Sequence, residues 1–309
     1  MKWLAAIFAT SFALQAAPVT ALRFSPDGKH LLISRTRAIE VQALEGDDKP
    51  RKIPCAFDKV MAFAFSADGK TLAVAGGTPG DFGGVHLFEW PSGKLRGKWN
   101  VFEDVATCVA FGPFVNFAAG SADHSLVILN ARREGGVLRR FEGHTKAVRG
   151  LAYVPGGKSI VTVSADRTVK MWGVATTQLE RSFGNHLGPV HAVAFRPHAK
   201  PPFCVTASDD KTVRVWQPTI GRMVRIVRGH GGPVFAVAFS PDGRRIFSIG
   251  KEGIGRIIDA DSDKVLHEWK AHDDWVYALA VGPKGRLATG DWRGTVKIWK
   301  VKGDKAFRQ

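Results

Sequence analysis

Apolar and polar residues alternate in short runs along this chain, and one such run recurs with small changes. Its apolar segment ends in an aromatic residue or valine, and a turn rich in Pro, Gly and Asp follows. The seven copies read ALRFSPDG, AFAFSADG, CVAFGPFV, LAYVPGG, AVAFRPHA, AVAFSPDG and ALAVGPKG. Alternation with a period of two is typical of half-buried β-strands, so the pattern predicts seven similar strand-and-turn units.

The spacing of these units predicts the fold. Their last apolar residues are Phe24, Phe65, Phe111, Tyr153, Phe195, Phe239 and Val281. A period near 42 residues with strand-like content is typical of a propeller with four strands per blade. We therefore expect an all-β, seven-bladed β-propeller of four antiparallel strands per blade. It forms a single domain over residues 17–309, with blades at about 17–57, 58–103, 104–144, 145–187, 188–229, 230–271 and 272–309.

Within a blade, the pattern places each strand. In the fourth unit we expect strands at 147–153, 159–164, 168–172 and 178–183. The second blade carries an insertion, TPGDFGG at 78–84, between its second and third strands. Its glycines predict a mobile loop.

The N-terminal 16 residues differ from the rest of the chain. Lys2 precedes an apolar run from Trp3 to Leu14, and small residues follow. This order is typical of a secretory signal peptide, and the run is too short to span a membrane. We therefore expect residues 1–16 to be a signal peptide of an exported protein, periplasmic or secreted. If they are retained, the protein is cytoplasmic and residues 6–14, rather than 305–309, are able to supply the outer strand of the last blade.

Composition shows an excess of positive charge and does not indicate a disulfide framework. The formal net charge is +16, from 44 Lys and Arg against 28 Asp and Glu. Such an excess favours binding to acidic partners. The alternative is that the Lys and Arg residues only solubilise the turns. Cys55, Cys108 and Cys204 lie in apolar strand contexts without a CxxC pair, so we expect core residues rather than disulfides.

Particular residues in the later units resemble a known family. GHTKAV, NHLGPV, GHGGPV and AHDDWV each place a His four residues before a strand valine. SADRTVKMW and SDDKTVRVW add a tight turn and a Trp. The chain thus resembles the WD-repeat (WD40-type) β-propeller family over about residues 18–303, most clearly in the last four blades. With its leader it looks like a bacterial-type exported member.

The resemblance implies a buried hydrogen-bond chain of His, Ser or Thr, Asp and Trp in each complete blade. A buried polar network stabilises a fold only when all its members are paired. Because the set repeats with the blades, we interpret it as structural rather than as a catalytic triad. Blades four and five hold His144, Thr162, Asp166 and Trp172, and His186, Thr206, Asp210 and Trp216. Blade seven keeps His272, Thr289 and Trp299, with Arg293 where Asp belongs.

The resemblance also implies which residues meet a partner. In the family, partners touch two residues that flank the first inner-strand valine and one that precedes the turn Asp. Tyr, Trp and Arg are common interface anchors, and we expect the rings of blades six and seven to cluster unless they cover the channel. On this chain the expected contacts are Arg149, His191, Asp209, Phe235, Lys251, Trp275, Tyr277 and Trp292, with Lys59, Met61, Asp104, Ala106 and Ala122 in blades two and three.

No motif in the sequence indicates catalysis. There is no Gly-rich phosphate loop, no HExxH and no metal-ligand spacing among the His residues. We expect no catalytic residue, no metal and no cofactor. The expected function is a non-catalytic scaffold for a protein or peptide, with no transmembrane span and an open oligomeric state. The alternatives are an electrostatic binder of nucleic acid or envelope polysaccharide through basic turns, and a propeller enzyme.

Overall fold

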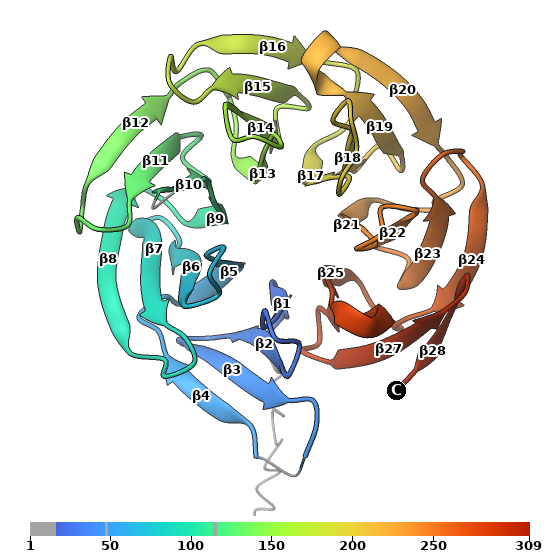
Figure 1. Cartoon of the computed structure of the whole chain (residues 1–309), viewed down its shortest axis with the longest axis horizontal. Coiled ribbons are helices and arrows are strands. Elements are labelled where there is room, and N and C mark those ends of the chain that lie inside the picture. The colour runs from blue at the N-terminus through green and yellow to red at the C-terminus, as the bar shows by residue number, and fades with distance from the viewer. Residues whose placement is uncertain (1–16, 47–48, 114–115) are drawn as a thin grey trace, which may run out of the picture.

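Seven small antiparallel sheets surround a central channel in the computed structural model of the chain (Figure 1). The structure describes residues 17–46, 49–113 and 116–309. The expected signal peptide, and the alternative outer strand at 6–14, lie outside these residues. Each sheet has four strands that are consecutive in sequence, so the fold is a seven-bladed β-propeller.

The strands of the first four sheets are as follows. Sheet one holds β1 (Leu22–Phe24), β2 (His30–Arg35), β3 (Ala38–Ala43) and β4 (Arg51–Pro54). Sheet two holds β5 (Lys59–Phe65), β6 (Thr71–Thr78), β7 (Phe82–Glu89) and β8 (Leu95–Phe102). Sheet three holds β9 (Ala106–Phe111), β10 (Asn116–Ser121), β11 (Leu126–Asn130) and β12 (Val137–Phe141). Sheet four holds β13 (Val148–Tyr153), β14 (Ser159–Ser164), β15 (Val169–Gly173) and β16 (Leu179–Phe183).

The last three sheets repeat the arrangement. Sheet five holds β17 (Val190–Phe195), β18 (Cys204–Ser208), β19 (Val213–Gln217) and β20 (Arg222–Val227). Sheet six holds β21 (Val234–Phe239), β22 (Arg245–Gly250), β23 (Ile254–Asp259) and β24 (Val265–Lys270). Sheet seven holds β25 (Val276–Val281), β26 (Arg286–Asp291), β27 (Val296–Lys302) and β28 (Lys305–Arg308). Two single 3₁₀ turns, η1 (Pro218–Ile220) and η2 (Pro283–Gly285), lie between strands.

The hydrophobic core lies between neighbouring sheets. Seven clusters of buried side chains fill the seven gaps of the ring, one cluster per pair of sheets. The second strand of each sheet is the most deeply buried, as in β14, whereas four of the five residues of the outer strand β16 are exposed. Burial on both faces explains why the second strands read as continuous apolar or small residues.

Among the described residues, the ring closes without a strand shared between its two ends. β28 pairs with β27, so residues 305–308 complete the seventh sheet as its outer strand. The amide of Val19 donates to the carbonyl of Asp291 at 3.0 Å across the junction. The cluster behind this bond joins Val19, Leu22, Phe24, Leu31 and Ile33 to three alanines of sheet seven. Arg286 adds an ion pair to Glu45 at 2.7 Å.

The insertion in the second blade is part of the sheet, so the expected loop at 78–84 is wrong. β6 and β7 stay paired as far as Thr78 and Phe82. A Cβ on Gly83 would lie 1.9 Å from the carbonyl oxygen of Asp104. A Cβ on Gly84 would meet the backbone of β8 in the same way. Gly83 and Gly84 therefore permit close backbone approach, which is a packing role and not a sign of mobility.

Two further features bear on function. Among residues 17–46, 49–113 and 116–309, no helix is long and apolar enough to cross a membrane. Cys55, Cys108 and Cys204 are buried, unpaired thiols. Burial raises the pKa of Cys55 to about 11 and that of Cys108 to about 12, so both stay protonated and unreactive at neutral pH.

Candidate partner-binding site

A repeated irregularity in the inner strands builds the site. The pairing of β13 with β14 skips one residue between Val148 and Gly150, and β17, β21, β25 and β5 skip one residue at the same place. A β-bulge of this kind leaves one residue unpaired and re-aims its side chain. The skipped residues are Met61, Arg149, His191, Phe235 and Tyr277.

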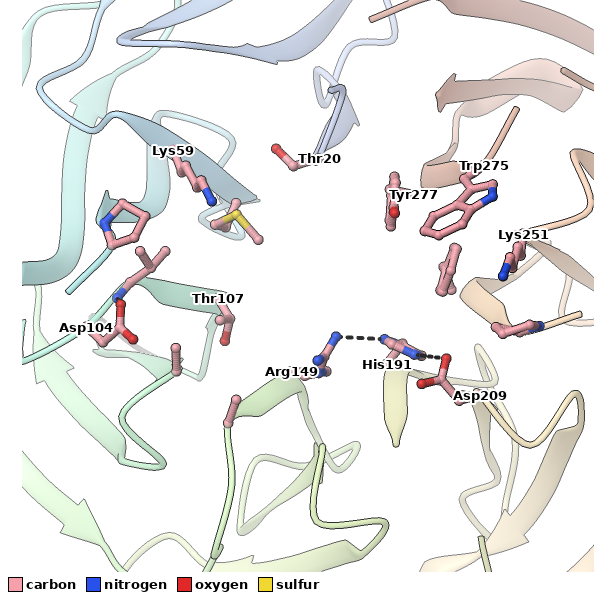
Figure 2. Close-up of a pocket in the computed structure, with 17 residues that line it drawn as sticks. Thr20, Lys59, Asp104, Thr107, Arg149, His191, Asp209, Lys251, Trp275 and Tyr277 are labelled. Atoms are coloured by element: carbon pink, nitrogen blue, oxygen red, sulfur yellow. Dashed lines mark hydrogen bonds and ion pairs between the residues drawn. The ribbon is translucent and has the colours of Figure 1, made fainter. Parts of the chain in front are cut away.

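These bulged residues line one cavity at the mouth of the channel. The cavity measures about 720 Å³ and lies on the face formed by the loops before the inner strands and by the turns that follow the second strands, here called the top face. The residues that line it come from all seven blades, with Thr20 from the first, and Figure 2 shows their side chains arranged around the open centre. A cavity of this size is within the range of ligand and peptide-segment pockets.

An aromatic wall forms one side of the cavity. The rings of Phe235 and Tyr277 stack with centroids 4.8 Å apart and planes 13° apart. Trp275 lies 6.2 Å from Phe235, and Trp292 lies 5.8 Å from Tyr277. Trp275 and Trp292 are 40% and 47% exposed. Four rings in contact, two of them well exposed, make an apolar patch of the kind that marks interaction sites on soluble proteins.

A chain of polar groups continues from this wall. His191 packs edge-on against Phe235, with ring centroids 5.1 Å apart. Its Nε2 lies 2.7 Å from Asp209 Oδ1 and its Nδ1 lies 3.1 Å from Arg149 Nη1, as Figure 2 shows. Because arginine only donates, Nδ1 accepts and Nε2 carries the proton. Burial lowers the pKa of His191, and Arg149 lowers it further, although Asp209 acts in the opposite direction.

The residues expected to meet a partner lie as follows. Arg149, His191, Asp209, Phe235, Lys251, Trp275 and Tyr277 line the cavity. Trp292 lies beside it, packed on Trp275 and Tyr277. Lys59, Met61, Asp104 and Ala122 line the opposite side.

One position of the third blade is corrected. Ala106 is fully buried, and the bulged residue that faces the cavity is Thr107. Ala106, rather than Val105, pairs with the last residue of β10, and it lies five residues before Phe111, as Val148 lies five residues before Tyr153 in blade four.

The His–Asp sets lie apart from the cavity, between strands. In blade four the Nδ1 of His144 donates to Asp166 at 2.7 Å, so the unprotonated Nε2 accepts from Thr162, also at 2.7 Å. Trp172 donates its indole N–H to the same hydroxyl at 2.8 Å. Blade five repeats this with His186, Asp210, Thr206 and Trp216 at 2.7–2.9 Å. Thr162 and Thr206 are fully buried, so neither hydroxyl is accessible to a substrate.

The environment fixes the protonation state of these sets. Burial lowers the pKa of both His144 and His186. Burial also disfavours the charged form of Asp166, but hydrogen bonds from Thr168 and His144 outweigh it and hold the pKa of Asp166 at about 2. At neutral pH each set is therefore a neutral imidazole beside an ionised carboxylate, locked by packing against the Trp ring.

In blade seven the structure differs from the expectation that the Asp is missing. Asp291 Oδ2 lies 2.8 Å from His272 Nδ1, while Thr289 and Trp299 take their usual places. Asp291 stands two positions before Arg293, where blade four has Ser164. Its other oxygen accepts from the amides of Arg293 and Thr295. The signal was present in the sequence, because an Asp two residues after the strand threonine reaches the same imidazole.

Blade six departs further from the pattern. His230 Nε2 lies 2.9 Å from Ser248, but Nδ1 has no hydrogen-bond partner among the residues that the structure describes. Glu252 pairs instead with Arg256 at 3.1 Å. Burial, with a contribution from Arg256, lowers the pKa of His230 to about 4. Blade three keeps only the turn aspartate, Asp123, which accepts from the amide of Glu103 at 2.9 Å, as Asp166 accepts from the amide of Thr145. Phe102 stands where blades four to seven have a His.

The basic turns of the opposite face are partly neutralised. Arg245 pairs with Asp304 at 2.9 Å, and Arg286 pairs with Glu45. Lys158 and Arg244 remain exposed on that side. Across the described ranges, no three His, Cys, Asp or Glu side chains are grouped so as to hold a metal ion.

Comparison with known proteins agrees with this geometry. The family model named WD domain, G-beta repeat, matches residues 135–173, 177–217, 221–259 and 263–300, slightly more than half of the chain. An uncharacterized WD repeat-containing protein of Synechocystis sp. is 32% identical over 143 residues, 45% of this chain and 38% of that protein. The chromatin assembly factor 1 subunit FAS2 homolog of Oryza sativa is 26% identical over 172 residues, 50% of this chain and 33% of that protein.

The chain thus spans well under half the length of these relatives. Each matched segment begins with the outer strand of one sheet and continues through three strands of the next, as 135–173 covers β12 to β15. The sequence repeat is therefore offset from the blade by one strand, so every matched repeat contributes strands to two neighbouring sheets. On these matches and this architecture, the chain belongs to the WD-repeat family.

Proposed function

We propose that this protein is a non-catalytic binding platform whose partner, a protein or peptide, docks on the top face at blades six and seven. Propellers of the WD-repeat family typically serve as protein-interaction scaffolds and are generally not enzymes. The observation that supports the site is the aromatic wall of Phe235, Trp275, Tyr277 and Trp292 at the rim of the cavity. The wall is rigid because Phe235 and Tyr277 lie on the adjoining inner strands β21 and β25, and Trp275 directly precedes β25.

Rigidity favours binding at this place. Each bulge fixes the direction of its side chain, and Phe235 and Tyr277 are further held by stacking on each other. A preorganised surface loses little conformational entropy when a partner docks, so more of the interaction energy appears as affinity. The complete His–Asp set of blade seven stiffens that blade from inside, whereas His230 of blade six bonds only Ser248 among the described residues.

The test is affinity capture with matched variants of the full chain. The baits are wild type, Trp275→Ala/Tyr277→Ala and Phe307→Ala, the last removing a half-exposed ring on the outer strand β28. Extract of the native cells is passed over each bait, and bound proteins are quantified by mass spectrometry after thermal melts show equal folding. We expect a partner that is retained by wild type and Phe307→Ala and lost with the double variant.

Equal capture by all three baits would contradict the top-face site. If moderate salt then removed the captured material, the function would move to the basic surface, because binding driven by phosphate or carboxylate charge weakens steeply with ionic strength.

A further inference from the structure

The positively charged side chains of the top-face cavity are less well paired than its carboxylates. Three cations line it, Lys59, Arg149 and Lys251, against two carboxylates, Asp104 and Asp209. Within the described part of the chain, none of the three cations forms an ion pair with a carboxylate. Asp104 accepts from the amide of Val105 at 2.7 Å, and Asp209 accepts from His191 at 2.7 Å. The unmatched charge in the cavity is therefore positive.

The cations are spread around the cavity. They come from blades two, four and six, and Figure 2 shows Lys59 facing Lys251 across the opening with Arg149 between them on one side. Arg149 and Lys251 are exposed. An anionic group that enters the centre of the cavity meets positive charge from several directions, an arrangement that favours carboxylates.

The aromatic wall adds a second preference and excludes cationic ligands. Lys251 Nζ lies 4.6 Å from the centroid of Trp275, so one ring face already holds a cation. A cationic group of a ligand on that face would have to displace the Lys251 ammonium or lie close to its positive charge. Tyr277 and Phe235 instead offer stacked, half-buried rings that suit an apolar or aromatic side chain.

Tyr277 carries a polar group at the boundary between the two halves. No acceptor for its hydroxyl is found among the residues that the structure describes. Burial raises the pKa of Tyr277, and Asp274 and Asp209 add to the effect. The phenol therefore stays protonated and is a donor for a ligand carboxylate or carbonyl.

We propose that the top-face cavity binds an acidic peptide segment of a partner protein. Its carboxylates lie among Arg149, Lys251 and Lys59, and a neighbouring aromatic or long aliphatic side chain packs against Tyr277 and Phe235. This assignment rests on the proposed function and gives it a ligand chemistry. A nucleic-acid strand is disfavoured because its continuous phosphate charge would meet Asp104 and Asp209 at the same mouth.

A selected peptide provides the test. A random peptide library displayed on phage is panned against the immobilised full chain, and the enriched sequences are read out. We expect Asp or Glu next to an aromatic or leucine residue. An enriched peptide is then labelled, and its affinity is measured by fluorescence anisotropy beside a version with Asp and Glu replaced by Asn and Gln.

The protein variants separate the two parts of the site. Arg149→Ala and Lys251→Ala should each weaken binding by about tenfold, as expected for loss of a charge-assisted contact. Trp275→Ala/Tyr277→Ala should abolish it. Lys158→Ala removes an exposed cation from the opposite face and should leave the affinity unchanged. Thermal melts exclude unfolding as the cause.

Two results would overturn the assignment in different ways. Enrichment of neutral or basic peptides, insensitive to Arg149→Ala but lost with the aromatic double variant, would reject the acidic ligand and leave the top-face platform in place. If no top-face variant weakened binding of the enriched peptide, or if Lys158→Ala weakened it as much as they did, both the ligand and the site would be rejected.

Discussion

At the scale of single residues, the position of a group in space matters more than its position in a motif. Asp291 gives His272 the same partner that Asp166 gives His144, from two positions earlier along the chain. It also accepts from two turn amides, as Asp166 does from Thr168 and Thr145. One side chain thus replaces both the strand-end serine and the turn aspartate of blade four.

A pair of substitutions tests this replacement. Asp291→Ala removes the acceptor of His272 Nδ1, a group that is 1% exposed, and leaves a buried donor unpaired. We expect the free energy of unfolding to fall by roughly 1–3 kcal/mol. Arg293→Ala, at the position where the motif places its Asp, removes only a solvent-exposed ion pair to Asp274 and should change stability by less than about 0.5 kcal/mol. Urea unfolding measures both, and equal losses would show that Asp291 has no special role.

At the scale of the element, the sheets differ in how well their polar groups are paired. Blades four, five and seven each hold a complete chain from Trp to Asp. Blade six buries His230 with Nδ1 unpaired, next to Arg256 and with Ile258 in place of the Trp. An imidazole in that setting must stay neutral, which makes this sheet sensitive to acid.

The acid sensitivity has a definite sign. The pKa of His230 is about 4 in the folded protein and about 6.5 when unfolded. Its contribution to stability is fully present above pH 6.5 and is lost as the pH falls towards 4, by about 2 kcal/mol between pH 7.5 and 5. His230→Gln keeps a partner for Ser248 but does not titrate, so its unfolding free energy should depend less on pH by that amount. Urea unfolding at both pH values measures this, and parallel pH profiles for variant and wild type would disprove the assignment.

The sequence predicted most of the strands, and its predictions were wrong where tertiary packing sets the local structure. The period and the alternation gave the class and the number of blades, because every blade repeats one burial pattern. The segment 78–84 was misjudged because Gly83 and Gly84 serve close backbone contacts, with Asp104 and with β8, rather than freedom of the chain. The family resemblance, carried onto the chain by the spacing of the units, gave the positions of the aromatic wall. Thr107 lies four residues before Phe111, as Arg149 lies four residues before Tyr153, so the spacing contained the correct position and the alignment on Val105 gave Ala106 instead.

At the scale of the molecule, the junction of sheets one and seven joins the two ends of the described chain. Its core contains small residues on one side, Ala278, Ala280 and Ala288. The two sheets approach so closely that a Cβ on Gly290 would lie 2.4 Å from Cγ1 of Val19. The closure therefore combines a tight fit at Gly290 with the packing of the larger side chains in the same cluster, among them Phe24, Leu31 and Ile298.

A single methyl group tests that fit. Gly290→Ala should force Val19 away from sheet seven and lower the free energy of unfolding by about 1–3 kcal/mol, the usual effect of overpacking. Gly184→Ala is the matched control, because no atom lies within 4 Å of its added Cβ. Hydrogen exchange followed by mass spectrometry should show faster exchange in residues 17–46 for the first variant only. Unchanged protection there would mean that the junction tolerates the methyl group.

The same junction sets how the ring responds to mechanical load. Every four-stranded sheet is made from one stretch of chain. Within the part of the chain that the structure describes, the Val19–Asp291 bond, the cluster behind it and a few side-chain contacts such as Arg286–Glu45 hold the first sheet to the last. A force applied between residues 17 and 309 therefore acts first on this junction and on β28, whose bonds open one after another as in unzipping. The ring would split into an open arc with its inner sheets intact, and on release it would close again without any strand having to be exchanged.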